Sequence, residues 1–511
     1  MNMRGSHRRS PAVLATGFVL VLGGALAAQA AAPTDFIKNV GAAQKLGKAL
    51  FWDEQSGGDG RTACATCHFN QGVDARVINT VAPGPNGTFD IAGITRPGQT
   101  LTAAAFPFGK DDKIGSQGVV AATFRNIVPG SAVDNCTVTG VHRQVTGRQA
   151  PSVFQAERNI HNFWDGRANN IFNGVDPSGR ANRNARIFVS SGNKLVAQAV
   201  QIEPAAMASQ AVGPPNNGVE MSCAGRIFPE LGRKMLSLTP LGQQHVDATD
   251  SVLGRLAWPG TGLNTSYTAL IQAAFNSNLW NSTKTVPFTT VSGVQQFSQT
   301  EANFSLFWGL AIQEYVKLLV PHNSRFDRWD LDAEEELGLE IFTGEGRCVS
   351  CHRDTEPQDD FTAASRNSGG GGSAFVNTGV RPVAEDSGVQ PAAVGEFKTP
   401  TVRNAELSGP YFHNGGHLTL MQVVDFYDRG GDFPSEQTDS HIRPLGLTEG
   451  EKRALVAFML ALTDDRARIN AAPFDHPDID VPNFGLVQAT GAAGDAGNPA
   501  RRFLGADPFA H

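Results

Sequence analysis

After its first 30 residues, the chain has no apolar run that approaches the 18 or so residues of a membrane-spanning helix. We therefore expect no membrane span in the mature protein. The chain also lacks an excess of positive charge, since its formal net charge is −7 at pH 7, and this argues against binding to nucleic acid. Only 41% of the residues are hydrophobic, against 56 glycines and 29 prolines, which favours long loops between short helices.

The N-terminus is the one strongly apolar stretch. Arg8 and Arg9 precede an apolar run over 12–28, and Ala28-Gln29-Ala30 is a small-x-small cleavage site. This pattern is typical of a secretory signal peptide over 1–30, and less of an uncleaved anchor. The sequence therefore predicts export to the periplasm of a Gram-negative bacterium.

Cysteine is scarce, and four of the six cysteines fall in two C-x-x-C-H motifs. These are Cys64-Ala65-Thr66-Cys67-His68 and Cys348-Val349-Ser350-Cys351-His352. The pattern is the attachment signature of haem c, in which two thiols form thioethers and the histidine is the proximal iron ligand. A pair of zinc sites or thiol redox motifs is the alternative. We predict two covalently bound haem c groups, with Cys64, Cys67, Cys348 and Cys351 as attachment points and His68 and His352 as proximal ligands.

The two remaining cysteines are Cys136 and Cys223. Spare thiols often pair in an oxidising compartment. Sequence alone does not test the geometry that a disulfide requires, so their pairing stays open at this point.

Helical periodicity and capping residues predict a mainly α fold with two cytochrome-c-like haem domains, the first enlarged by long loop insertions. Residues 69–150 and 173–219 show no sustained period and are expected to be loops, with a short strand near 118–127. The expected helices lie at 35–52, 265–279, 298–319, from Asp332 toward Cys348, and from Thr448 to about Leu462. The expected units are 1–30 (signal peptide), 31–325 (first haem domain), 326–484 (second haem domain) and 485–511 (tail).

Several blocks in a fixed order resemble the bacterial diheme cytochrome c peroxidases, a superfamily that includes the methylamine-utilisation enzyme MauG. They run from about residue 44 to 463, and the unmatched insertions between them are chiefly 69–140, 173–210 and 224–262. The matching blocks are Leu46–Phe51, Phe163–Arg167, Asn323–Arg328, Phe397–Asn404 and Pro410–Gly415.

The resemblance implies that the N-terminal haem reacts with hydrogen peroxide and that the second haem stores or relays an electron. It also implies that Trp164 lies between the haems and that Glu220 is the distal acid–base group, with Gln210 and Pro214 in the distal pocket. A carboxylate near an open iron position can move the proton that O–O cleavage requires. From the residues alone, Glu220 could equally be a solvated loop carboxylate and Trp164 a core aromatic.

The distal ligand of the second haem separates the branches of this superfamily. Most members place a methionine there, whereas the corresponding position here is Tyr427, as in MauG. A phenolate is a hard anionic donor that lowers the iron potential. Met421 and Met459 are the competing ligands, but Met421 is six residues too early and Met459 fits the interior of a helix.

The family's calcium site corresponds to Gln149 with the backbone carbonyls of Ser408 and Pro410, and amide and carbonyl oxygens suit Ca²⁺. His413 and His417 are four residues apart, yet the glycines between them argue against a helix presenting both to a metal.

The expected function is that of a periplasmic diheme peroxidase that reduces H₂O₂ and shares oxidising equivalents with a His/Tyr-ligated second haem. Its expected partner is a periplasmic electron donor, namely a small c-type cytochrome, a cupredoxin or a protein substrate. The alternatives are a diheme oxygenase acting on a hydrophobic or macromolecular substrate and a non-catalytic electron-transfer cytochrome.

Overall fold

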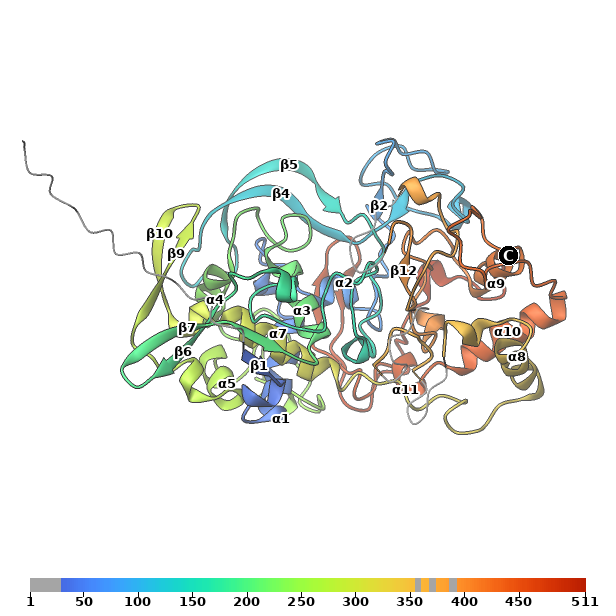
Figure 1. Cartoon of the computed structure of the whole chain (residues 1–511). Helices are drawn as coiled ribbons and strands as arrows, with labels where there is room; N and C mark the ends of the chain where they lie inside the picture. Colours follow the sequence, from blue (N-terminus) through green and yellow to red (C-terminus); the bar gives the residue numbers. More distant parts are fainter. Residues whose placement is uncertain (1–28, 354–359, 367–373, 386–392) are drawn as a thin grey trace, which may run out of the picture.

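The computed structural model describes residues 29–353, 360–366, 374–385 and 393–511. Nearly all of the predicted signal peptide therefore lies outside the described residues. Figure 1 shows two halves side by side, the first built mostly from the blue to yellow part of the chain and the second from the orange to red part. Each half contains one C-x-x-C-H motif.

The helices follow the capping residues in the sequence. The predicted capping boxes at Ser298, Asp332 and Thr448 are all formed, each with a glutamate three residues later. The helix expected over 298–319 is divided in two at Asn303. The helices are α1 Val40–Trp52, α2 Ala65–His68, α3 Ala206–Ala211, α4 Phe228–Leu236, α5 Tyr267–Ala274, α6 Gln299–Ala302, α7 Phe304–Val316, α8 Ala333–Thr343, α9 Leu420–Asp428, α10 Glu449–Ala461 and α11 Asp465–Arg468.

The strands form only two-stranded sheets among the described residues, and all of these are antiparallel except β1–β8. The others are β2–β3, β4–β5, β6–β7, β9–β10, β11–β12 and β13–β14. The strands are β1 Gln29–Ala31, β2 Val81–Ala82, β3 Lys113–Ile114, β4 Gln117–Asn126, β5 Asn135–Val145, β6 Ile187–Ser191, β7 Lys194–Gln198, β8 Val200–Ile202, β9 Thr285–Thr290, β10 Gly293–Ser298, β11 Phe375–Val376, β12 Phe397–Lys398, β13 Ile479–Val481 and β14 Gly485–Val487.

The prediction of a mainly α fold is confirmed only in part, because the chain is 28% helix but also 17% strand and is therefore not clearly mainly α. The expected strand near 118–127 is confirmed as β4, but β5, which pairs with it, was not foreseen. Most residues of β5 are exposed or half-buried. A ribbon that buries so little apolar surface gives only a weak alternating pattern in sequence.

The two halves repeat one helix crossing. Helix α1 packs against α7 in the first half, and α8 packs against α10 in the second. A Cβ atom built on Gly47 would lie 1.9 Å from the Ala311 carbonyl oxygen, and one on Gly338 would lie 2.0 Å from that of Ala454. Both glycines allow a backbone approach that no side chain would permit.

Each half has its own hydrophobic core, but two segments cross from one half to the other. Segment 467–487 contributes Phe474 and Ile479 to the core of the first half. Conversely, Ile114 of the segment 77–114 packs with Leu418 of the second half and with Phe503, which is buried although it belongs to the predicted tail. The halves are therefore interleaved, and each helps to complete the other.

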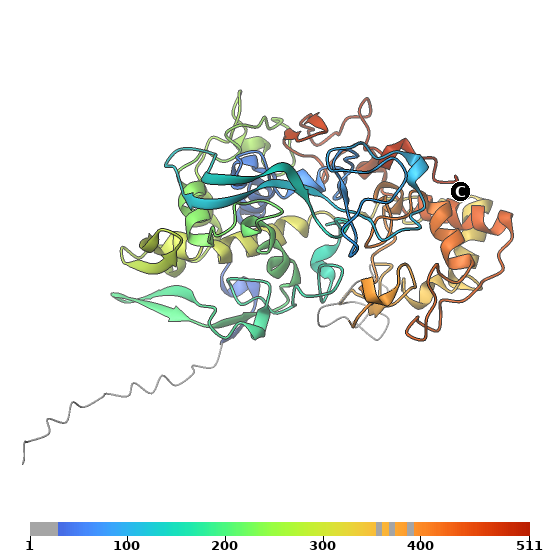
Figure 2. The ribbon, with the colours of Figure 1, turned by 90° about the horizontal axis from the view of Figure 1, so that it is seen from above.

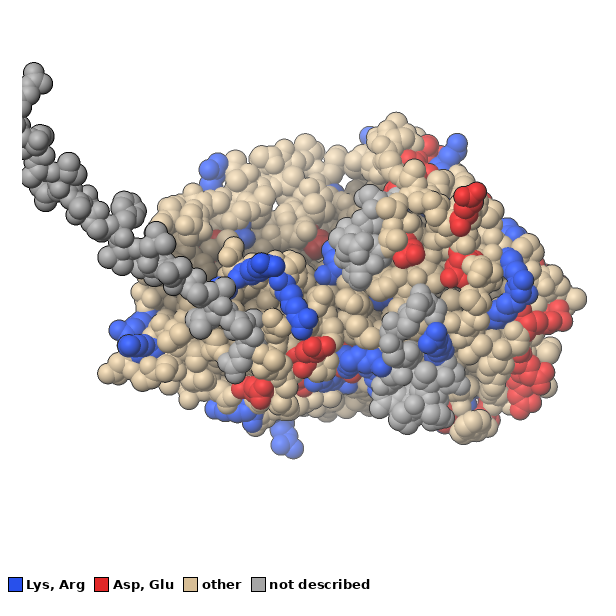
Figure 3. All heavy atoms as spheres, in the orientation of Figure 1, with Lys and Arg blue, Asp and Glu red and all other residues tan. Residues whose placement is uncertain are grey.

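The β4–β5 hairpin arches over the first half, as the views from the side and from above both show (Figures 1 and 2). Acidic side chains gather at the far end of the second half on the face shown in Figure 3, near α8 and α10. In the part of the chain that the structure describes, no helix is both long and apolar enough to cross a bilayer.

Candidate haem sites

The two motif histidines are oriented in the same way. The Nδ1–H of His68 donates a hydrogen bond to the Gly72 carbonyl oxygen at 2.8 Å, and that of His352 donates to the Pro400 carbonyl oxygen at 3.0 Å. This bond fixes the tautomer and leaves Nε2 available to bind iron. Burial lowers the pKa of both imidazoles, that of His352 to about 4, so both rings are neutral at pH 7, as a metal ligand requires.

A cavity of about 220 Å³ opens beside the second motif. Cys348, Cys351 and His352 line it, together with Tyr427 from α9 and Met459 from α10. The structure thus brings both predicted attachment cysteines, the predicted proximal ligand and the predicted distal ligand to one cavity. The wall is predominantly apolar, as a pocket for a large planar cofactor should be.

The three candidate distal ligands of the second haem differ in whether they line the cavity. Met421 is fully buried in the core of the second half and does not line the cavity. Tyr427 and Met459 both line it, so the expectation that Met459 only packs inside a helix misses its position on the wall. The Tyr427 hydroxyl has no hydrogen-bond partner among the described residues, and burial raises its pKa, with the two motif thiols adding to the shift.

Two cations in the cavity wall test whether the residues fit a haem. Lys398 is only 7% exposed, and its ammonium has no ion-pair or hydrogen-bond partner in the described part of the chain. Burial lowers the Lys398 pKa to about 8. The buried Nη1 of Arg347 is also without a partner. A buried cation is costly unless an anion neutralises it, and haem carries two carboxylates, so these residues fit the group.

Trp164 lies on the same wall, toward the first half. Its Nε1–H donates to the Gln149 carbonyl oxygen at 2.8 Å, and its own carbonyl oxygen accepts from the Lys398 backbone N–H at 2.7 Å. Its ring lies 6.4 Å from that of His413, which stacks on Phe397 at 3.5 Å. These contacts hold the indole in one orientation at the junction of the two halves.

The three residues predicted for calcium also come together. Gln149, Ser408 and Pro410 all line the cavity, and a Cβ on Gly415 would lie 3.4 Å from Pro410 and 3.5 Å from Gln149. The buried Nε2 of Gln149 has no hydrogen-bond partner. In the described residues, no group of three or more histidine, cysteine or acidic side chains could hold a metal ion.

Glu220 lies close to the first motif. Its carboxylate contributes to raising the pKa of the Cys64 and Cys67 thiols, to about 12 and about 11, after the larger effect of burial. Burial raises the pKa of Glu220 itself, and Arg167 partly opposes that shift. No described residue donates a hydrogen bond to the half-buried carboxylate, so its oxygens remain free to exchange a proton.

Gln210 and Pro214 begin the loop that carries Glu220. Gln210 lies in the last turn of α3, and its carbonyl oxygen accepts from the Gly213 N–H at 3.0 Å. A Cβ on Gly213 would lie 3.2 Å from the Phe163 ring, which sets this turn beside the segment that contains Trp164. Neither Gln210 nor Pro214 forms a hydrogen bond or an ion pair with Glu220, and both remain predictions as pocket residues.

Sequence reasoning missed the roles of Pro400 and Lys398. Both lie in the block Phe397–Asn404, which the sequence singled out only as a family pattern. The structure explains part of that pattern, since Pro400 anchors His352 and Lys398 brings a buried cation to the cavity.

The family described as di-haem cytochrome c peroxidase matches residues 127–336, a range between the two motifs. Cytochrome-c peroxidase IdrP2 of Denitromonas iodatirespirans is 33% identical over 221 residues, which cover 37% of this chain and 57% of that protein. Methylamine utilization protein MauG of Methylorubrum extorquens is 30% identical over 172 residues, covering 31% and 44%. The chain thus spans about half the length of the curated relatives it matches.

Among solved structures, the diheme peroxidase BthA from Burkholderia thailandensis E264 aligns over 87% of this chain and 90% of that one. Its identity of 17% and TM-score of 0.43 are too low to carry an argument about function. The matches in sequence show what the chain is similar to, namely the diheme cytochrome c peroxidases and MauG, and the family model covers its residues 127–336.

Proposed function

We propose that the protein is a periplasmic diheme peroxidase that reduces H₂O₂ at its first haem site and shares the resulting oxidising equivalents with the second. The observation that carries this proposal is the Glu220 carboxylate, which is half-buried, raised in pKa and unpaired beside the first motif. A plain electron-transfer cytochrome has no need of such a group. Covalent attachment of haem c outside the cytoplasm accounts for the predicted signal peptide.

The chain's own residues have separable roles. When bound, haem supplies an iron that exchanges electrons with peroxide. His68 presents a neutral Nε2 toward the iron because Gly72 holds its Nδ1. Glu220 takes the proton from one peroxide oxygen and returns it to the other, and its raised pKa brings it nearer to neutrality, where a group can both accept and donate. The oxygen that receives the proton leaves as water, and two electrons from the donor with two further protons convert the other oxygen to a second water molecule.

The second site is proposed to hold oxidising equivalents. Tyr427 is the proposed distal ligand opposite His352, and Trp164 is the proposed path for electrons between the two sites. Lys398 and Arg347 would neutralise the haem carboxylates. A periplasmic donor, either a small c-type cytochrome or cupredoxin or a protein substrate, would restore the resting state, and the acidic end of the second half suits a basic donor (Figure 3).

Replacing Glu220 tests the peroxidase proposal. Glu220→Gln removes the proton carrier and keeps the side-chain size, so the rate of reaction with H₂O₂ should fall by about 10²- to 10⁴-fold, the usual contribution of general acid–base catalysis. Stopped-flow spectroscopy of the holoprotein measures this rate. The matched control is Glu230→Gln, since burial also raises the pKa of Glu230 but its carboxylate caps α4 at Ile227.

The resting spectra test the same proposal in a second way. One high-spin and one low-spin ferric haem in electron paramagnetic resonance, both losing their signals on addition of H₂O₂, support the peroxidase. Two low-spin haems inert to peroxide would leave an electron carrier instead.

The distal ligand of the second haem is tested by a pair of variants. Tyr427→Phe should convert the low-spin haem to a high-spin form because the phenol oxygen is lost, while Met459→Leu should leave the spectrum unchanged. Electron paramagnetic resonance at low temperature reads both. The reverse pattern would assign Met459 as the ligand and remove Tyr427.

A further inference from the structure

The loop that carries Glu220 is joined to the β4–β5 hairpin along its length. The Val119 N–H donates to the Val219 carbonyl oxygen at 3.0 Å, and the Ala224 N–H donates to the Ala122 carbonyl oxygen at 2.8 Å. Thr123 and Ala224 also form a parallel bridge. Segment 219–224 thus lies alongside β4 as a loop that is hydrogen-bonded to it at both ends, with Glu220 within it.

The second strand of the hairpin contacts the same loop. The Gln144 side-chain amide donates to the Gly218 carbonyl oxygen at 2.7 Å. A Cβ on Gly118 would lie 1.9 Å from the Val219 carbonyl oxygen, so the hairpin backbone approaches the loop as closely as a glycine allows.

The opposite face of the loop rests on the segment that leads into the first haem motif. The Gly58 N–H donates to the carbonyl oxygen of Met221, the residue after Glu220, at 2.7 Å. A Cβ on Gly58 would lie 3.0 Å from the Cys223 nitrogen. The loop is therefore held between the hairpin and residues six positions before Cys64.

A buried charge cluster fixes the base of this arrangement. Asp134, which precedes β5, pairs with Arg226 at 2.7 Å and with Lys234 at 3.0 Å, and all three side chains are fully buried. Arg226 also donates to the Ser56 carbonyl oxygen at 3.0 Å, and Lys234 donates to that of Gly57 at 2.7 Å. One aspartate of the hairpin thus connects the loop, α4 and the approach to the first motif.

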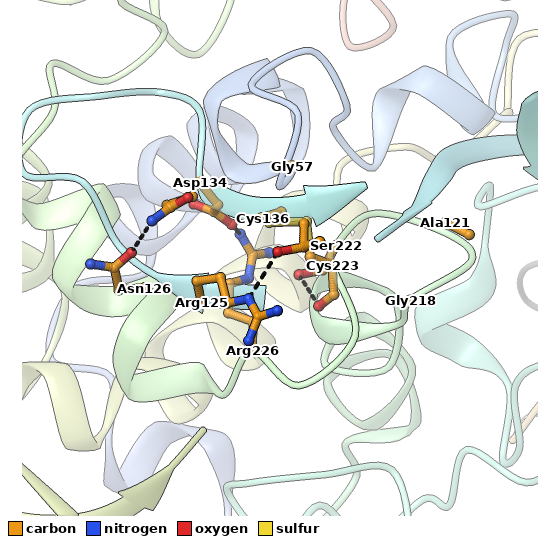
Figure 4. Close-up of a disulfide and its surroundings, with 12 residues drawn as sticks. Gly57, Ala121, Arg125, Asn126, Asp134, Cys136, Gly218, Ser222, Cys223 and Arg226 are labelled. Atoms are coloured by element: carbon orange, nitrogen blue, oxygen red, sulfur yellow. Dashed lines mark hydrogen bonds and ion pairs between the residues drawn. A yellow bond between two sulfur atoms is a disulfide. The ribbon is translucent and has the colours of Figure 1, made fainter. Parts of the chain in front are cut away.

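The covalent link lies three residues after Glu220. Cys136 of β5 and Cys223 form a disulfide that spans 87 residues, which resolves the pairing left open by the sequence (Figure 4). Figure 4 shows Arg226 and Asp134 close to the disulfide. The hairpin could not separate from the loop without breaking this bond.

We propose that the β4–β5 hairpin is a clamp that positions Glu220 over the first haem site, and that the Cys136–Cys223 disulfide fixes the clamp. The proposal rests on the proposed function, since it assigns Glu220 an acid–base role. A catalytic group must be held within about 0.5 Å of its productive place by the residues around it. A loop lacking regular helix or strand does not supply that rigidity alone, and the hairpin does.

The test is a double-mutant cycle in the holoprotein. The variant Cys136→Ser/Cys223→Ser should lower the rate of reaction with H₂O₂ by about tenfold or more, while haem content and the second-haem spectrum stay unchanged. Because the clamp acts through Glu220, adding Glu220→Gln to this variant should lower the rate by much less than it does in the parent. Arg233→Gln is the control, because it removes contacts elsewhere in the same half, where Arg233 of α4 donates hydrogen bonds to Gln295 of β10 and Glu301 of α6.

Three results would overturn the clamp. A rate within about twofold of the parent, with both haems attached, shows that the disulfide does not position Glu220. Effects of the cysteine and Glu220 substitutions that simply multiply show a general structural role. An equal loss of rate in Arg233→Gln also shows a general structural role. If Glu220→Gln has no effect in the parent, the proposed function itself fails, and the cycle reports this separately.

A second variant covers the case in which the cysteine variant loses its haem. Gln144→Leu keeps the disulfide and removes the hydrogen bonds from the Gln144 amide to the carbonyl oxygens of Gly218, at 2.7 Å, and Val119, at 3.4 Å. It should lower the same rate, by less than the loss of the disulfide, and its effect should also shrink in the Glu220→Gln background. An unchanged rate in a folded Gln144→Leu protein, together with haem loss in the cysteine variant, would overturn the clamp.

Discussion

The two halves share one framework and differ in what surrounds it. Each has the sequence Leu-Gly-x-x-(Leu or Ile)-Phe in its first helix, a glycine at the helix crossing, and a motif histidine whose Nδ1 is held by a carbonyl. In the first half, α5 also packs on α1 and Leu46 is fully buried. In the second half the corresponding Leu337 is 43% exposed.

The difference extends to the charged residues. The buried lysines of the first half are paired, Lys48 with Asp250 at 2.8 Å and Lys234 with Asp134. The buried Lys398 of the second half faces a cavity without a partner among the described residues. The first half therefore pairs these buried lysines with aspartates, and the β4–β5 hairpin lies over its motif. The second half has cations in its cavity wall that have no such partner among the described residues.

Removing the disulfide should separate the stabilities of the two halves by the largest amount. A link over 87 residues contributes about 4 to 5 kcal/mol on the chain-entropy estimate. In Cys136→Ser/Cys223→Ser, the first half should unfold at lower denaturant concentration than the second. Far-UV circular dichroism, followed together with the absorbance of each haem, measures this. A single transition with unchanged midpoint would show that the disulfide adds no stability.

The two crossing glycines should respond alike. Gly47→Ala and Gly338→Ala each place a Cβ within 2 Å of a carbonyl oxygen and should destabilise their own half by about 3 kcal/mol. Gly450→Ala is the matched control, because no atom lies within 4 Å of its added Cβ and alanine favours a helix by about 0.5–1 kcal/mol. Urea unfolding measures all three. Unequal losses of unfolding free energy in Gly47→Ala and Gly338→Ala would show that the two helix crossings are not equivalent.

The effect of replacing Lys398 on the reduction potential should be confined to the second haem. With Lys398→Met, an uncompensated haem carboxylate should lower the reduction potential of that haem and make it depend on pH near neutrality. Spectroelectrochemistry measures both haems in one experiment. In the parent, stability would rise between pH 8 and about 10.5 if Lys398 kept its lowered pKa of about 8, because the unfolded chain would then bind the extra proton. Pairing of Lys398 with a haem carboxylate abolishes this rise in stability. A rise that persists in the holoprotein would refute the pairing.

The sequence predicted those features that local patterns encode. The motifs at Cys64 and Cys348, the capping boxes at Ser298 and Asp332 and the strand near 118–127 depend on neighbouring residues, and all are present in the structure.

The remaining features depend on contacts between distant residues. The Cys136–Cys223 disulfide joins two insertions, and its geometry follows only from the pairing of β4 with β5 and of β4 with 219–224. The unpaired state of Lys398 and the place of Met459 on the cavity wall likewise follow from tertiary packing. Patterns of neighbouring residues do not specify such contacts. The strand content was underestimated because exposed strands such as β5 show only a weak alternating pattern.

The interleaving of the halves has a consequence for biogenesis. His476 stacks on Trp52 with ring centroids 4.7 Å apart, and both rings line a small cavity that also includes His68. The wall behind the first haem ligand is thus completed by residues made more than 400 positions later. If the chain is exported from its N-terminus, as the proposed function requires, this site would stay unfinished until almost all of the chain had crossed the membrane. Under the proposed function, both haems would be attached while the chain is still open, and the first half would close only when its last segment arrives.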